Sequence, residues 1–532
     1  MMVPGFSSPT VMKHDFSRIP GVTIPRSSFK RSHGYKTTLN SGYLIPIYCD
    51  EALPGDTFNL KLSSVARLNT PIVPFMDNLH MDFFFFAVPN RLLWNNWQRF
   101  CGERDPDPDS SIDYLVPRIT TPAGGYAEES LADYFGIPIG IDNLEINALH
   151  FRAYNLIYNE WFRDQNLQDS VTVDLDDGPD DPADYVLLKR GKRHDYFTSC
   201  LPWPQKGDAI DLPLGTVAPV LGIGKDDQNY NTGPITVYET GQTGSTSFAD
   251  YSLATSGTTW RIEEDPDNAG FPGIFADLSN ATAATINSLR EAFQLQRMLE
   301  RDARGGSRYI ELIQSHFGVT APDFRLQRPE YLGGGSRRVA IDPIPSTLEV
   351  TGSRALGDLG AIGFQNQSGV GFTKSFVEHS VIIGLVNIRA DLTYQKGVNR
   401  MWSRQTRYDY FWPSLSHLGE QAVLNKEIYA QGNIDDDLIF GYQERWAEYR
   451  YYPSLITGLM RSDAVTSLDN WHLSQDFSAL PQLNSTFIEE DPPIDRVVAV
   501  PAEPDFQFDA YFDITCARPM PLYSVPGFID HF

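Results

Sequence analysis

Apolar and polar residues alternate in three stretches of the chain, and this period of two is typical of strands with one buried and one wet face. The clearest stretch covers residues 506–516, where every even position is apolar. Residues 58–68 repeat the pattern with Ser64 as its flaw, and residues 386–394 repeat it again. Residues 80–88 are largely apolar and predict a strand covered on both faces that ends at Pro89.

These predicted strands lie near both ends of the chain and in its later middle, so the sheets must form from distant segments. This arrangement favours a mainly β sandwich or barrel with long excursions between its strands. Helical spacing of apolar residues predicts two helices inside the excursions, over residues 144–163 and 284–303. For the second helix, Ser279, Asn280 or Thr282 can cap the start and Gly305–Gly306 can end it. We expect both helices to pack on the barrel or between subunits.

Length and charge limit the function classes. The chain has 532 residues, more than the roughly 250–300 at which a single core stops growing, so it has two domains or one core with large insertions. Its formal net charge of −25 excludes a uniformly basic DNA-binding protein, and any nucleic acid must meet a local basic patch or a basic partner.

The four cysteines include no CxxC pair, which argues against zinc or disulfide frameworks. No apolar run approaches the roughly 20 residues of a membrane span, and we expect a protein that is soluble when made.

Residues 206–277 differ from the rest of the chain. They contain eleven acidic and three basic residues, and residues 231–259 are dense in Thr, Gly and Ser. This composition is typical of a solvated loop without a task of its own, or of an exposed loop that recognises a partner.

A search for catalytic and metal-binding patterns finds none. The sequence has no GxSxG, HExxH or Walker motif, and its ten histidines form no metal-binding pair. Asp105, Asp107 and Asp109 resemble the start of a calcium loop but lack its glycine and its twelfth-position acid. The run at residues 435–437 and this cluster are better interpreted as solvated loops. We expect no enzyme, no cofactor and no metal site.

Three consecutive glycines at residues 333–335 lack the spacing of a dinucleotide-binding loop. They predict a turn where backbones approach closely, since glycine has no Cβ. Arg337 and Arg338 follow directly and are a weaker candidate for phosphate binding.

Two basic segments are candidates for DNA contact. Residues 1–36 carry six basic residues and one acidic residue, and four prolines keep the segment extended. This arm either touches DNA phosphates, through Arg26, Lys30 and Arg31, or ties neighbouring subunits together.

The second segment is residues 400–412, in which Arg400, Arg404 and Arg407 are interleaved with Trp402 and four further aromatic residues. Arginines attract phosphates and aromatic faces stack on unpaired bases, but both residue types are also enriched in protein interfaces. The sequence leaves DNA contact and a subunit interface open.

Four blocks of sequence resemble the major capsid proteins of gokushoviruses, the small icosahedral single-stranded-DNA phages of the Microviridae. They are residues 198–207 (TSCLPWPQKG), 289–335 (which ends in LQRPEYLGGG), 420–432 (EQAVLNKEIYAQG) and 441–450 (GYQERWAEYR), with residues 18–97 in support. The resemblance covers most of residues 16–532 and is weakest over 105–129, 174–184 and 231–277.

The resemblance implies an eight-stranded viral jelly roll over residues 41–532, with long insertions that contain a few helices, after an extended basic arm over residues 1–40. It also implies that residues 206–277 form a surface protrusion at the three-fold axis. Host attachment through this protrusion is a further hypothesis, for which the exposed candidates are Asn231, Tyr238, Tyr251 and Trp260.

The function implied is a structural coat protein, made in the host bacterial cytoplasm, of which about 60 copies form a T=1 shell around a circular single-stranded DNA genome. The partners implied are the chain itself, a small basic DNA-packaging protein, a minor pilot protein, the genome and a host cell-surface receptor. The alternative from another class is a β-sandwich protein that binds or hydrolyses glycans.

Overall fold

The computed structural model describes residues 25–103, 114–208, 220–221, 235–238, 245–248, 255–256, 259–260, 275–276, 286–305, 308–318, 327–347 and 356–523. Two compact units divide the chain. One unit contains residues 1–204 and 321–532, and the other contains residues 205–320.

The first unit is built on two antiparallel sheets. The strand order of the first sheet is β1-β20-β4-β16-β15, and β2 also pairs with β20. The order of the second sheet is β14-β5-β17-β3. The strands of the first sheet are β1 Ser27–Lys30, β2 His33–Leu39, β4 Thr57–Leu68, β15 Ala340–Pro345, β16 Leu359–Ser375 and β20 Phe506–Arg518, and those of the second are β3 Ile45–Ala52, β5 Leu79–Pro89, β14 Glu330–Arg338 and β17 Ser380–Ala390.

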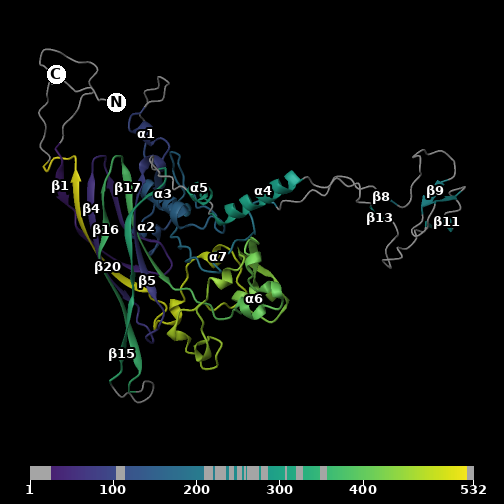
Figure 1. Cartoon of the computed structure of the whole chain (residues 1–532). Helices are drawn as coiled ribbons and strands as arrows, with labels where there is room; N and C mark the ends of the chain where they lie inside the picture. Colours follow the sequence, from purple (N-terminus) through teal and green to yellow (C-terminus); the bar gives the residue numbers. More distant parts are fainter. Residues whose placement is uncertain are drawn as a thin grey trace, which may run out of the picture. The chain divides into compact units, whose positions relative to one another are not determined.

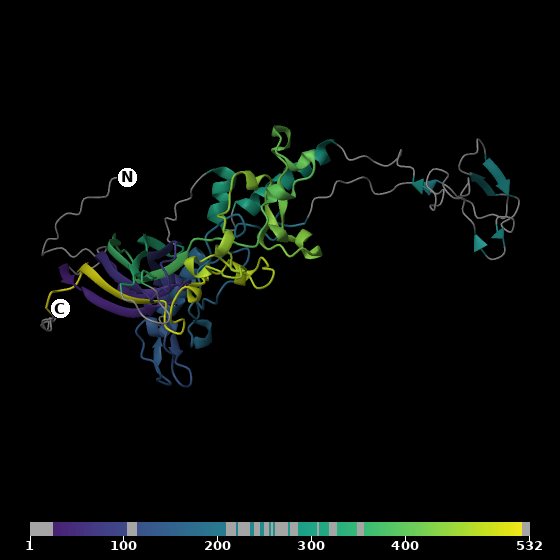
Figure 2. The same cartoon turned by 90° about the horizontal axis from the view of Figure 1, so that it is seen from below.

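The first and last strands of the chain lie side by side, as both views show (Figure 1, Figure 2). The eight strands in the orders β2-β20-β4-β16 and β3-β17-β5-β14 form the double sheet of a jelly roll. The expectation of a mainly β sandwich with long insertions is therefore confirmed.

One hydrophobic core fills the space between the sheets. The alternate residues of β20 and β4 point into it, as the period of two predicts, and its aromatic contacts join Phe508 to Phe83 and Phe372 to Phe85. The alternation of buried and exposed residues in β4 continues through Ser64, since its side chain is buried on the core side. It is a polar residue at an inward position and not a break in the strand.

The prediction for residues 386–394 is wrong in its boundaries and in its wet face. Strand β17 ends at Ala390, and every one of its residues is buried. The predicted wet face is covered by polar contacts, since Asn387 donates hydrogen bonds to the carbonyl oxygens of Gly42 and Tyr43 and Arg389 pairs with Asp82. Further along the same face, Ile383 and Leu385 belong to a second core with the helix α3 (Leu149–Ile157). The strand β5 lies beside β17 and is covered on both faces, as its apolar sequence predicts.

The predicted helices exist with changed limits. Within residues 144–163, α3 is shorter than predicted, because Glu145–Asn147 is the strand β7 and Tyr158–Phe162 continues as a π-helix. The helix predicted over 284–303 is α4 (Ile286–Arg304), which ends at Gly305. The residues proposed to cap its start lie outside the described residues.

The predicted turn at Gly333, Gly334 and Gly335 is wrong, because these residues lie inside β14 and pair with Phe85, Phe84 and Phe83. The close approach is confirmed. A Cβ on Gly334 would lie 2.1 Å from the carbonyl oxygen of Phe83, and one on Gly333 would lie 2.7 Å from that of Gly371. The missing side chains allow the backbone of β14 to approach β5 in its own sheet and β16 in the other sheet.

Two long excursions leave the sandwich. The one between β5 and β14 contains α1 (Trp97–Phe100), β6 (Arg118–Thr120), α2 (Leu131–Tyr134), β7, α3 and the second unit, in which lie β8 (Val220–Leu221), β9 (Ile235–Tyr238), β10 (Ser245–Phe248), β11 (Thr255–Ser256), β12 (Thr259–Trp260), β13 (Phe275–Ala276), α4 and α5 (Tyr309–Phe317). The one between β17 and β20 contains β18 (Glu420–Leu424), α6 (Asn425–Ile428), β19 (Ile439–Glu444) and α7 (Ser485–Ile488). A third small core joins the two excursions, because Phe197 of the first packs with Val423 and Phe440 of the second.

Candidate functional site

The arginine–aromatic segment, residues 400–412, runs across the surface of the second excursion. It is built from short 3₁₀ turns at Arg400–Ser403 and Arg407–Asp409. The side chain of Asn399 caps the first turn by accepting a hydrogen bond from the backbone N–H of Met401 at 3.0 Å. Asp409 caps the second, and the hydrogen bonds that it accepts from Thr406 and then Gln405 lower its pKa to about 2.

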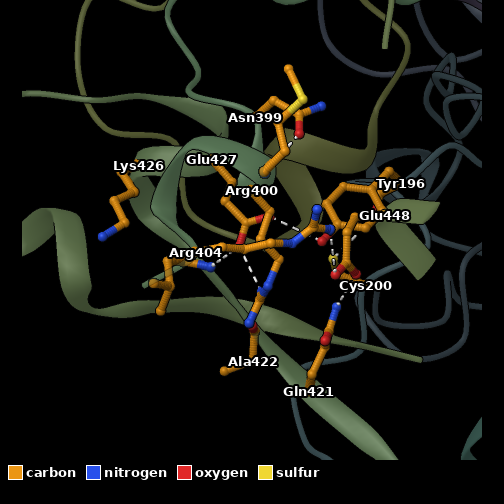
Figure 3. Close-up of polar contacts among 12 residues, drawn as sticks. Tyr196, Cys200, Asn399, Arg400, Arg404, Gln421, Ala422, Lys426, Glu427 and Glu448 are labelled. Atoms are coloured by element: carbon orange, nitrogen blue, oxygen red, sulfur yellow. Dashed lines mark hydrogen bonds and ion pairs between the residues drawn. The ribbon is translucent and has the colours of Figure 1, made fainter. Parts of the chain in front are cut away.

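Arg400 points inward and is paired with a carboxylate. Its Nη1 lies 2.9 Å from Oε1 of Glu427 and donates a hydrogen bond of 2.7 Å to the carbonyl oxygen of Ala422 (Figure 3). The hydroxyl of Tyr196 donates to the other oxygen of Glu427 at 3.0 Å. Burial raises the pKa of Glu427, and the charge of Arg400 opposes that rise. The guanidinium is therefore held by the protein itself.

Arg404 is engaged in the same way. Its Nη2 lies 3.3 Å from Oε1 of Glu448, whose other oxygen accepts a hydrogen bond of 2.7 Å from Gln421. Its guanidinium also lies over the ring of Tyr449, 4.1 Å from the centroid. The side chain of Arg404 is only 11% exposed, so its guanidinium group is not accessible to a nucleic acid.

The third arginine and the aromatic residues face outward. Arg407 is exposed and lies over the ring of Trp412 at 4.7 Å. Trp402 is 76% exposed and Tyr408 is 68% exposed, which is rare for such large side chains. The other large side chains of the segment, Met401, Tyr410 and Phe411, are also exposed, and the ring of the half-exposed Tyr449 lies 6.4 Å from that of Phe411. We call this set, with Trp402, Tyr408 and Trp412, the aromatic patch.

A cavity under the segment is too small to accept a base. It has a volume of about 50 Å³ and is lined by Tyr196, Tyr394, Arg400, Tyr451 and their neighbours. Ligand pockets have volumes of ~300 Å³ or more. A few waters fit this space, so stacking on bases would have to use the exposed rings.

A larger cleft of about 410 Å³ lies elsewhere on the same unit, and its charge is of the wrong sign for DNA. Its one cation, Lys189, is paired with Asp491 at 2.8 Å. The other charged residues that line the cleft are acids, which include Glu129, Asp495, Glu503 and Asp505.

The N-terminal candidates lie at the start of the first sheet. Arg31 pairs with Asp50 through two contacts of 2.6 and 3.0 Å. Arg26 donates hydrogen bonds to Thr57 and to the carbonyl oxygen of Ala517. Lys30 is exposed on β1 and forms no ion pair with the described residues. The first 24 residues lie outside the described part of the chain.

Of the protrusion candidates, Tyr238 ends β9 and pairs with Ser245 of β10, and Trp260 ends β12 and pairs with Thr255 of β11. Asn231 and Tyr251 lie outside the described residues. The two hairpins belong to the second unit, which runs from Gln205 to Thr320 and includes α4 and α5 as well as the predicted insertion.

The acidic clusters show no metal geometry. Asp435–Asp437 lies in a 3₁₀ turn, where Asp436 accepts backbone hydrogen bonds from Gln431 and Gly432 and Asp437 pairs with Lys426 at 2.7 Å. Throughout the described ranges, no group of three His, Cys, Asp or Glu side chains is placed to hold a metal ion. The cluster at residues 105–109 is outside them. None of the described helices is both long and apolar enough to cross a bilayer.

Sequence reasoning missed the carboxylates Glu427, Glu448 and Asp50, which neutralise three of the candidate arginines. Glu427 and Glu448 are 27 and 44 residues from their partners along the chain. Spacing carries no signal for pairs of this kind, since tertiary folding alone brings them together.

Comparison with known proteins gives a consistent result. A family described as capsid protein (F protein) matches residues 17–528. Capsid protein VP1 of Bdellovibrio phage phiMH2K is 51% identical over 98% of both chains. Capsid protein VP1 of Chlamydia phage 1 is 44% identical over 99% of both, and that of Spiroplasma virus 4 is 39% identical over 97% of both.

Proposed function

The chain belongs to the phage capsid protein (F protein) family and is a structural protein of the virion, and we propose that its copies contact one another through the aromatic patch. A capsid protein assembles with itself into a shell. The family membership favours this function over the glycan-binding alternative.

The orientation of the segment at residues 400–412 supports the interface and not the DNA contact. Arg400 and Arg404 are occupied by buried carboxylates, while Trp402 and Tyr408 project into solvent. Exposed aromatic residues with arginines stacked among them are characteristic of the centre of protein interfaces. The observation that carries the proposal is that the guanidinium groups of Arg400 and Arg404 are paired inside the protein while the aromatic side chains are exposed.

Assembly of the full-length chain tests the proposal. We expect Trp402→Ser with Tyr408→Ser to abolish particles in size-exclusion chromatography and electron micrographs, while circular dichroism stays that of the parent. Tyr511→Ser is the matched control, because Tyr511 is half exposed on the outer face of β20. Normal particles from the double variant would contradict the interface.

The DNA interpretation of the same segment has its own readout. If Arg407 touched the genome, Arg407→Gln would give particles of normal size with less DNA, seen as a lower ratio of absorbance at 260 and 280 nm. A substitution at Arg404 does not discriminate, since it also breaks the pair with Glu448.

Further parts of the function extend the family resemblance. We propose a closed shell of about 60 copies, in which symmetry multiplies modest contacts. The basic composition of residues 1–36, in which Lys30 is exposed on β1, supports contact with a single-stranded DNA genome, and the charge of −25 supports a small basic packaging partner. The acidic composition of residues 206–277 supports an outer protrusion used in host attachment. Deleting residues 228–260 should then reduce adsorption to host cells without preventing assembly.

A further inference from the structure

The helix α4 carries a line of arginines along one side. With 3.6 residues per turn, positions 290, 293, 297, 301 and 304 fall on a single stripe. The stripe consists of Arg290, Phe293, Arg297, Arg301 and Arg304, all of them exposed, and we call it the α4 stripe. Phe293 is 62% exposed. The buried residues of the helix, Ala292 and Ala303, lie on the opposite side.

Three arginines of the stripe differ from Arg400 and Arg404, whose guanidinium groups are paired with carboxylates. Within the described residues, Arg290, Arg297 and Arg301 form no ion pair. Of the three acids on the helix, Asp302 lies 2.6 Å from His316 of α5, and Glu300 accepts a hydrogen bond from Gln296.

We propose that the α4 stripe is a binding site for an unpaired nucleic-acid strand. The proposal deepens the proposed function, since it rests on a capsid protein that encloses single-stranded DNA. Guanidinium groups form paired hydrogen bonds to phosphate oxygens, and a row of them on a helix is the electrostatic footprint of a nucleic-acid site. Phe293 lies between Arg290 and Arg297, where its ring can stack on a base.

The shape of the stripe favours a strand over an acidic patch of a second copy. Arg290, Arg297 and Arg301 extend along about 17 Å of helix, as a line and not as a cluster. A nucleic-acid backbone presents a matching line of negative charges, whereas acids on a protein surface are scattered. A single exposed ring within the line also fits a chain of bases better than an interface core.

Oligonucleotide binding by the soluble full-length chain tests the site. The probe is a fluorescent 20-nucleotide thymidine strand, measured by anisotropy at several salt concentrations. We expect Arg297→Glu with Arg301→Glu to weaken binding at least about tenfold and to reduce the salt slope by roughly 1.4, or 0.7 for each lost phosphate contact. Lys61→Glu with Arg67→Glu makes the same charge change on the exposed face of β4 and should have little effect.

The ring is tested separately. We expect Phe293→Ala to weaken binding of the thymidine strand about fivefold or more. The same variant should bind a strand of abasic sites as the parent does, because that probe has phosphates but no bases.

The outcomes separate this inference from the proposed function, since particle formation is scored on the same variants. Unchanged binding by Arg297→Glu with Arg301→Glu would overturn the site, and loss of particles together with unchanged binding would assign the stripe to an acidic surface of a second copy. Equal weakening by the Lys61 and Arg67 control would also overturn it, because only overall charge would then matter.

Discussion

The segment at residues 400–412 and the α4 stripe both combine arginines with aromatic residues, yet they present opposite surfaces. In the segment, Arg400 and Arg404 face buried glutamates and the rings of Trp402 and Tyr408 face water. In the stripe, Arg297 and Arg301 face water and form no ion pair within the described residues. The comparison teaches that an arginine's neighbours in space, and not its spacing in sequence, decide whether its charge stabilises the fold or is available to a partner.

Removing Arg400 should have the largest effect on stability. Arg400→Ala leaves Glu427, whose side chain is 3% exposed, as a buried carboxylate without its cation, and this loss costs about 3–5 kcal/mol of unfolding free energy. Urea unfolding of the soluble chain measures it. Arg297→Ala on the stripe is the matched control and should change stability by no more than about 0.5 kcal/mol.

A rescue sharpens this comparison. Arg400→Met with Glu427→Gln removes both charges, and we expect it to recover at least half of the loss. A loss below about 1 kcal/mol in Arg400→Ala would mean that the pair contributes no more than a surface pair does.

A pH dependence should come from Glu490, a buried carboxyl near arginines without an ion pair to any of them. Burial raises its pKa to about 7, against the opposing effects of a hydrogen bond from Ala390 and of nearby Lys192 and Arg190. The folded pKa lies above the unfolded value. The stability from this group is therefore fully present below about pH 4.5 and is lost as the pH rises through about 7.

The neutral variant Glu490→Gln keeps its stability as the pH rises. We expect it to match the parent near pH 4.5 and to exceed it by up to about 3 kcal/mol at pH 8, in unfolding experiments at both pH values. Glu503→Gln removes the same charge from the surface, and a pH-dependent difference of the same size there would contradict the assignment to Glu490.

The smallest effect should come from Arg404→Lys. Lysine keeps the charge opposite Glu448 but loses the planar group that lies over Tyr449 at 4.1 Å, which costs about 1 kcal/mol. Thermal or urea unfolding detects this change. The equivalent Arg301→Lys on the stripe should be neutral for stability, and equal losses in both variants would remove the distinction between the two surfaces.

Much of the fold could be predicted from local pattern. The alternation over residues 506–516 predicts β20 and its buried face, and the apolar run over residues 80–88 predicts β5 as a strand covered on both sides. The pattern failed at β17, because distant segments cover the face that alternation assigned to water, where Asn387 donates hydrogen bonds to Gly42 and Tyr43. It failed again at residues 333–335, since glycine serves equally in a turn and in a crowded strand.

The sequence by itself determined the family, the β architecture and the presence of one arginine–aromatic segment at residues 400–412, because strand periodicity and family motifs are local properties. Only the tertiary structure decided which arginines are neutralised. The partners Glu427, Glu448 and Asp50 are brought to their arginines by the packing of distant segments, whereas Arg290, Arg297 and Arg301 of the α4 stripe form no ion pair within the described residues. Coulombic attraction depends on distance and burial, and neither is encoded in residue spacing.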